Sequence, residues 1–198
     1  QQDQLLDIAK ACVEAGNPNR YFKFASTSKV TFPGAGVAAM AASPENVAET
    51  KKRMGVQTIG HDKLNQMRHV RFLKDADGIA AHMAKHASII RPKFELVLKM
   101  LEEGLAGTGC GSWSNPRGGY FVSFDAPEGT AKHIVAMAKE AGVTMTGAGA
   151  TYPYKNDPKD SNIRIAPTLP PLEELESALK VFVCLSLIHI SEPTRLQL

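Results

Sequence analysis

The sequence predicts an α/β fold, in which short strands alternate with helices along a chain of 198 residues. Alternating aromatic and polar residues predict a strand over 20–25. Apolar residues at three- and four-residue spacing predict mostly helix over 61–105. Residues 120–124 predict another strand, and residues 130–141 predict a helix that Gly142 ends. This alternation along the chain is typical of α/β architectures.

Composition is that of a globular protein and disfavours several functional classes. Hydrophobic residues make up 43% and charged residues 22%. No apolar run reaches the length of a membrane span, and a net charge of +3 is too small to indicate nucleic acid or an anionic membrane as partner. Cys12, Cys110 and Cys184 follow no CxxC spacing, which favours free thiols in a reducing compartment. We therefore expect a cytoplasmic protein without nucleic-acid or membrane partners.

Local signals divide the rest of the chain. The small apolar residues up to Ala42 predict a buried strand, and Ser43-Pro44 predicts the start of a helix, with serine as the N-cap. Pro92 is expected to kink or divide the helical region around it. Further short strands are predicted over 143–145 and 162–166, and a closing helix over 171–184.

The first segment that could carry chemistry is Ser26-Thr27-Ser28-Lys29, after a predicted strand. A neutral lysine amine can form a Schiff base with a carbonyl cofactor, and neighbouring hydroxyls can donate to a phosphate. Gly34 and Gly36 would let the backbone approach a ligand. The alternatives are an exposed lysine on a surface turn, which these four residues alone favour, or the Ser-x-x-Lys nucleophile of penicillin-binding proteins. The latter also needs a Lys-Thr-Gly or Lys-Ser-Gly strand, which this sequence lacks.

Two later segments are also candidates. Arg164 lies among apolar neighbours in 162–167, where its planar fork could bind a carboxylate, although a lone arginine favours a structural pair with Asp or Glu. Gly118-Gly119 precedes an aromatic strand, which indicates either close approach to a ligand or a tight turn. His82 and His86 have the spacing of a zinc helix but lack its glutamate, so a solvated helix face is predicted. Arg68, His69 and Arg71 are likewise predicted on a solvated or interdomain face.

Taken in order, the Ser-x-Ser-Lys, Pro-Arg-Gly-Gly-Tyr-Phe and Asn-Ile-Arg-Ile-Ala-Pro segments resemble class I/II pyridoxal-phosphate-dependent aminotransferases of fold type I. Four further stretches resemble the bacterial aspartate aminotransferase-like subgroup, also labelled MocR-like: 32–40, 57–60, 64–72 and 147–154. The resemblance covers nearly all of residues 1–184. It implies the end of a large cofactor-binding domain over 1–75, a connecting helix over 76–105 and a small C-terminal α/β domain over 106–184. Residues 185–198 are interpreted as a translated sequencing adapter that is not native.

The resemblance also implies roles for individual residues. Lys29 would form the Schiff base with pyridoxal 5′-phosphate and then move a proton at the substrate. Ser26 and Ser28 occupy the positions of phosphate-contacting hydroxyls, and Arg164 that of the arginine that binds the substrate α-carboxylate. Gln57 and Thr58 would approach the cofactor of the partner subunit in a homodimer.

One position departs from the pattern. Val37 stands where many class I members have a phosphate-binding arginine, eight residues after the lysine. Another cation could substitute, or the phosphate could be held differently.

The implied reaction moves an amino group between an amino acid, of aspartate or alanine type, and a 2-oxo acid. The alternative is a ligand-sensing domain of a transcriptional regulator, in which an aminotransferase-like domain keeps much the same Lys and Arg. In this family an upstream region supplies the aromatic residue that stacks on the cofactor ring and the aspartate that pairs with its nitrogen. This chain alone is therefore expected to be inactive.

Overall fold

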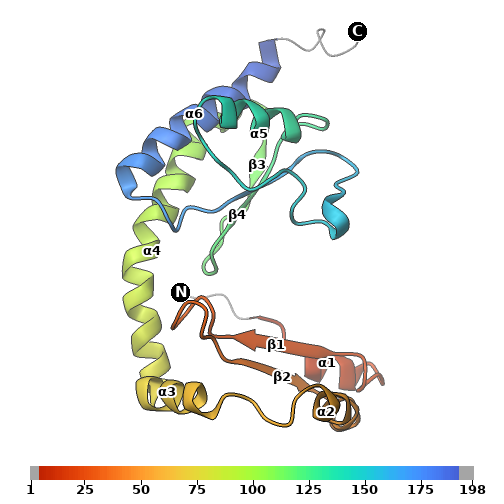
Figure 1. The fold of residues 1–198 in the computed structure, drawn as a ribbon. Helices are drawn as coiled ribbons and strands as arrows, with labels where there is room; N and C mark the ends of the chain where they lie inside the picture. Colours follow the sequence, from red (N-terminus) through yellow and green to blue (C-terminus); the bar gives the residue numbers. More distant parts are fainter. Residues whose placement is uncertain (1–4, 192–198) are drawn as a thin grey trace. The chain divides into compact units, whose positions relative to one another are not determined.

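The computed structural model describes residues 5–191, the last three of them through their backbone alone (Figure 1). The chain forms two compact units that divide between Ala87 and Ser88. This division falls inside the longest helix, α4 (Ala76–Leu105), which therefore contributes its first part to one unit and its second part to the other.

The unit that precedes Ser88 combines a two-stranded antiparallel sheet with helices. Its elements are α1 (Ile8–Glu14), β1 (Phe22–Ser26), β2 (Ala38–Ala42), α2 (Pro44–Gln57), α3 (Lys63–Leu73) and the first part of α4. The N-cap prediction is confirmed, because Ser43 accepts a hydrogen bond from the backbone N–H of Asn46 at 3.3 Å with Pro44 as the first helical residue.

Strand β2 forms as predicted, but the prediction that it is buried is wrong. The side chains of Ala38, Ala39 and Ala41 are exposed. In the part of the chain that the structure describes, β2 pairs only with β1, and Phe24 of that partner is 77% exposed. Among the described residues, this sheet has only two strands, too few to bury both of its faces.

Pro92 was predicted to kink or divide the helical region, and helix α4 is continuous across it, so the proline does not divide the helix. A proline inside a helix costs about 3 kcal/mol because it removes a backbone hydrogen bond and crowds the preceding turn. The turns that follow Pro92 bury Val97, Leu101 and Leu105 in the core of the second unit. That burial favours continuation of the helix after the proline.

The second unit packs helices on one face of a three-stranded antiparallel sheet. Its elements after α4 are β3 (Ser112–Trp113), β4 (Val122–Asp125), α5 (Ala131–Glu140), the 3-10 turn η1 (Pro153–Lys155), β5 (Asn162–Ile165) and α6 (Leu172–Ser191). The strand order is β3-β4-β5. Its core joins α4, α5 and α6 to the sheet, with Phe124 against Phe182 at a ring-centroid distance of 5.0 Å.

The alternation of strands β4 and β5 separates an apolar face of this sheet from a polar one. The side chains buried in the core are Val122, Phe124, Ile163 and Ile165. Their neighbours along the strands project to the opposite face, and the cross-strand pairs there are Ser123 with Arg164 and Asp125 with Asn162. The polar face therefore carries Arg164, which the sequence analysis singled out.

Two predicted boundaries differ from the structure. Residues 143–145 form no strand. The edge of β5 that could have paired with them is unpaired among the described residues, since β5 pairs only with β4 there. The closing helix does not end at 184 but runs to Ser191. Leu185 and Leu187 pack against the core, and the buried Ser186 donates its hydroxyl to the carbonyl oxygen of Phe182 at 2.9 Å. The rest of the segment interpreted as an adapter, residues 192–198, lies outside the described residues.

Candidate functional site

Lys29 lies on a tight turn directly after β1. We call residues 27–31 the lysine turn. The N–H groups of Val30 and Thr31 both donate to the carbonyl oxygen of Thr27, at 2.8 and 2.9 Å. Thr27 and Val37 share two further hydrogen bonds. The N–H of Thr27 donates to the carbonyl oxygen of Val37 at 2.9 Å, and the N–H of Val37 donates to Thr27 Oγ1 at 2.8 Å. Val37 thus closes the hairpin loop through its backbone, a contact that is independent of its side chain.

Two serine hydroxyls converge beside Lys29. Ser26 Oγ and Ser28 Oγ are 2.5 Å apart, and the backbone N–H of Ser28 donates to Ser26 Oγ at 3.1 Å. One hydroxyl proton is used between the two oxygens, so the pair can donate the other outward. Both serines and Lys29 are exposed. The turn therefore presents a hydroxyl donor and an amine on the same stretch of five residues, 26–30.

Gly36 makes this arrangement possible. A Cβ at this position would lie 2.6 Å from Ser28 Oγ and 3.0 Å from Ser28 Cα. Both distances are shorter than ordinary van der Waals contacts between such atoms. The loop can therefore approach Ser28 only because residue 36 has no side chain, whereas the predicted approach of Gly34 and Gly36 to a ligand stays a prediction.

Two histidines hold the lysine turn, although neither was predicted as a site residue. His69 was predicted on a solvated or interdomain face, but it is only 6% exposed and its Nε2 lies 3.1 Å from Thr27 Oγ1 and 2.7 Å from Thr31 Oγ1. His82 was predicted on a solvated face, but it is half-buried and its Nε2 contacts the carbonyl oxygen of Val30 at 2.6 Å. The signal in the sequence was the threonine pair around Lys29, whose hydroxyls need partners when the turn packs on helices.

In the second unit, Arg164 lies on the polar sheet face with an unusual environment. Its guanidinium carbon lies 4.4 Å from the centre of the Phe121 ring, a cation–π distance. Its Nε is buried and has no hydrogen-bond partner within residues 5–191. No carboxylate of the described chain pairs with it, so the alternative of a structural Arg–Asp/Glu pair finds no support there. A buried guanidinium donor without a partner favours a ligand that brings an acceptor.

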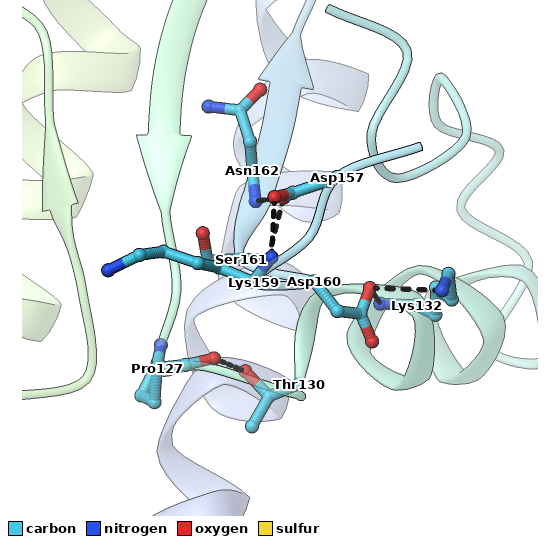
Figure 2. Close-up of polar contacts among 8 residues, drawn as sticks. All are labelled: Pro127, Thr130, Lys132, Asp157, Lys159, Asp160, Ser161 and Asn162. Carbon is cyan, nitrogen blue, oxygen red and sulfur yellow. Dashed lines mark hydrogen bonds and ion pairs between the residues drawn. The ribbon is translucent and has the colours of Figure 1, made fainter. Parts of the chain in front are cut away.

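The strand that carries Arg164 is fixed at its start by Asp157 (Figure 2). The Asp157 carboxylate accepts hydrogen bonds from the backbone N–H groups of Asn162 and Ser161, both at 2.8 Å, and of Lys159 at 3.0 Å. These bonds, that from Asn162 foremost, hold the pKa of this carboxyl below its ordinary value of 3.8. The backbone is thus pinned two residues before Arg164.

The remaining predicted site residues lie at the end of α2. Gln57 is its last residue and is exposed. The hydroxyl of Thr58 donates to the carbonyl oxygen of Gly60 at 3.0 Å, so its proton is used locally. Their proposed approach to a partner subunit stays a prediction.

Among the described residues, no three His, Cys, Asp or Glu side chains come together as a metal site would require. A search of the same residues for a helix with the length and apolarity of a membrane span finds none.

Comparison with known proteins gives a consistent match. The family model described as aspartate amino-transferase matches residues 1–196, a range that includes most of the segment interpreted as an adapter. A Mycolicibacterium smegmatis protein named as an aminotransferase is 48% identical over 187 residues, which is 94% of this chain and 44% of that protein. The chain spans less than half the length of the curated relatives that it matches, 44% of one and 41% of another.

Solved structures give the same match at the level of the fold. The structure of an aspartate transaminase from Corynebacterium glutamicum has a TM-score of 0.90 at 44% identity, covering 98% of this chain and 46% of that one. The α-aminoadipate aminotransferase LysN from Thermus thermophilus, solved with N-(5′-phosphopyridoxyl)-L-leucine, has a TM-score of 0.77 at 21% identity, covering 98% of this chain and 48% of that one; this shows the fold alone. The predicted α/β fold is confirmed.

Proposed function

Because the chain belongs to the aspartate amino-transferase family, we propose that the protein containing it transfers an amino group between an amino acid and a 2-oxo acid. The proposed cofactor is pyridoxal 5′-phosphate, which when bound would supply an electron sink for bond breaking at the substrate α-carbon. The observation that carries this proposal is the exposed amine of Lys29 in the lysine turn, beside the hydroxyls of Ser26 at the end of β1 and Ser28 in the turn.

The residues of the turn fit such a cofactor. Lys29 would bond the aldehyde carbon through Nζ with loss of water. Once the substrate amino group has displaced it from that carbon, the freed Nζ would carry a proton as general base and acid. Ser26 and Ser28 would donate to the phosphate. Their 2.5 Å contact leaves one hydroxyl proton for an outside acceptor, and the missing side chain at Gly36 leaves room for the Ser28 hydroxyl.

Arg164 would bind the α-carboxylate of the amino acid. Its buried Nε without a partner supports this role, since a carboxylate can accept two parallel hydrogen bonds from one guanidinium. Phe121 stacks on the guanidinium and restricts its orientation. The aminotransferase names of the relatives favour this enzyme over the ligand-sensing regulator.

We further propose a homodimer in which Gln57 and Thr58 contact the partner's cofactor site. Support comes from the exposed apolar residues of the first unit, among them Val56 and Ile59 at 92% and 105% exposure on either side of those two residues. The three free cysteines support a reducing compartment such as the cytoplasm.

The direct test is amino-group transfer by the full-length protein that contains this chain. With pyridoxal 5′-phosphate, an amino acid of aspartate or alanine type and 2-oxoglutarate as the acceptor, we expect glutamate to form. The 198-residue chain alone, assayed identically, should show no turnover, because it covers less than half of its relatives. No transfer by the full-length protein with any amino acid donor would refute the proposed function. Turnover by the chain alone would refute the expected need for further residues.

A further inference from the structure

The polar contacts of His69 and His82 converge on the residues that flank Lys29. His69 projects from α3 and reaches the hydroxyls of Thr27 and Thr31, two residues before and two residues after the lysine. His82 projects from α4 and reaches the carbonyl oxygen of Val30, the residue that follows the lysine. Both histidines belong to the same compact unit as the turn.

The partners fix the hydrogen positions on both rings. The Nδ1 of His69 lies 2.9 Å from the carbonyl oxygen of Asn65, which can only accept, so Nδ1 carries a hydrogen. In the neutral ring Nε2 is then the acceptor for a threonine hydroxyl. The Nε2 of His82 faces a carbonyl oxygen and must be the donor. The two histidines therefore use opposite ring nitrogens as donors.

Aromatic packing restricts how far either ring can turn. The Phe32 ring packs in a T-shaped arrangement with His69, at a centroid distance of 5.4 Å, and lies 5.3 Å from the centroid of Phe72. Phe72 in turn forms a T-shaped pair with His82 at a centroid distance of 5.0 Å. One aromatic row thus links the two histidines. Asn65 also donates from Nδ2 to the carbonyl oxygen of Ala35 at 2.9 Å, which ties α3 to the far side of the loop.

We propose that His69 and His82 form a clamp that positions Lys29 by holding the backbone of its turn on both sides. They are positioning residues, because their hydrogen bonds reach residues 27, 30 and 31 of the turn. The clamp fixes where the lysine Cα lies relative to the serine pair, and so the reach of the amine toward the cofactor. This inference rests on the proposed function only where cofactor binding is measured.

Paired substitutions separate hydrogen bonding from ring shape. His69→Asn keeps an amide donor near Nδ1 but loses the group that meets the threonines, whereas His69→Gln places an amide near Nε2. His82→Gln keeps a donor for the Val30 carbonyl, whereas His82→Phe keeps the aromatic contact with Phe72 and loses the donor. His133→Asn, on the exposed side of α5, is the control.

Two readouts in the full-length protein test the clamp. The first is the dissociation constant for pyridoxal 5′-phosphate, followed by visible absorbance. The second needs no cofactor: the rate at which an amine-reactive ester labels Lys29, relative to the exposed Lys52 on α2, determined by peptide mass spectrometry. Thermal unfolding is recorded in parallel for every variant.

We expect His69→Asn and His82→Phe to weaken cofactor binding about tenfold, the effect of losing one well-placed hydrogen bond, and to change the labelling ratio. The two glutamine variants should restore both values while sharing the lower unfolding temperature. If His69→Asn and His69→Gln gave the same dissociation constant and labelling ratio, and His82→Phe and His82→Gln did so too, the clamp would be refuted. If His69 variants do not fold, Thr31→Val, which removes one hydroxyl at constant volume, must show the same two effects or the clamp is refuted. If wild type binds no cofactor, the proposed function fails, and the labelling ratio still decides the clamp.

Discussion

Substituting Gly36 by alanine tests whether the loop after Lys29 must lie against the serine pair. The added Cβ would be 2.6 Å from Ser28 Oγ and 3.0 Å from Ser28 Cα. The hydroxyl could rotate away, but the Cα belongs to the backbone, so the loop itself must move by several tenths of an ångström. Forcing an extra methyl into such a site costs about 1–3 kcal/mol.

That strain corresponds to a factor of about 5–150 in an equilibrium constant. If it is relieved by moving Ser28 or the turn, it should appear as weaker binding of pyridoxal 5′-phosphate. A titration of the full-length protein followed by visible absorbance measures this, and urea unfolding measures any loss of stability. The strain should weaken cofactor binding, lower the stability to urea, or be divided between the two, according to which part of the loop moves.

Gly55→Ala is the matched control, because it makes the same chemical change inside α2 where a Cβ meets no atom within 4 Å. It should leave cofactor binding unchanged and stabilise the fold by about 0.5–1 kcal/mol, since alanine is the better helix former. If Gly36→Ala binds the cofactor within about twofold of wild type and also unfolds at the same urea concentration, the reasoning about close approach at Gly36 is refuted.

Two further substitutions test the second unit. Arg164→Gln should lower kcat/KM for the amino acid by at least about 100-fold, because the charged fork that pairs with the α-carboxylate is lost; steady-state kinetics check this, and a loss below about fivefold would exclude the assigned role. Asp157→Asn should lower stability at neutral pH. The folded-state pKa of Asp157 lies below 3.8, so its carboxylate stabilises the fold above that pH, and this stabilisation is lost as the pH falls from 3.8 through the lowered pKa. Urea unfolding at a series of acid pH values should therefore show that the free energy of unfolding falls less steeply with falling pH in the variant than in wild type. An identical slope for the two proteins would contradict the stabilising role of the Asp157 carboxylate.

Much of the fold could be predicted from local signals. The serine N-cap before α2, the alternating residues of β4 and the apolar period of α5 each depend on neighbours within about one turn or strand. Residues 143–145 were predicted wrongly because strand formation depends on a partner strand that sequence proximity does not reveal. The closing helix extends beyond residue 184 because Leu185 and Leu187 continue its apolar face and pack against the core.

The site was harder to predict, for a physical reason. Lys29 and its serines are contiguous, so a motif describes them. His69 and His82 lie 40 and 53 residues after Lys29 in the sequence, and only packing of α3 and α4 brings them to the turn. A histidine on a polar helix face is expected in solvent, but here the lysine turn provides the hydrogen-bond partners of both rings. The Nε–H of Arg164, which has no hydrogen-bond partner among the described residues, likewise follows from its place on the polar face of the sheet and not from any local pattern.

The central claim is that Lys29 holds the cofactor. The most direct measurement is reduction of the full-length, cofactor-loaded protein with borohydride, followed by peptide mass mapping. Reduction makes the bond between lysine nitrogen and cofactor permanent, so the phosphopyridoxyl mass should appear on the peptide that contains Lys29. The variant Lys29→Ala should show neither the modified peptide nor the visible absorbance of the bound cofactor. Modification of a different lysine, or full absorbance in Lys29→Ala, would contradict the assignment.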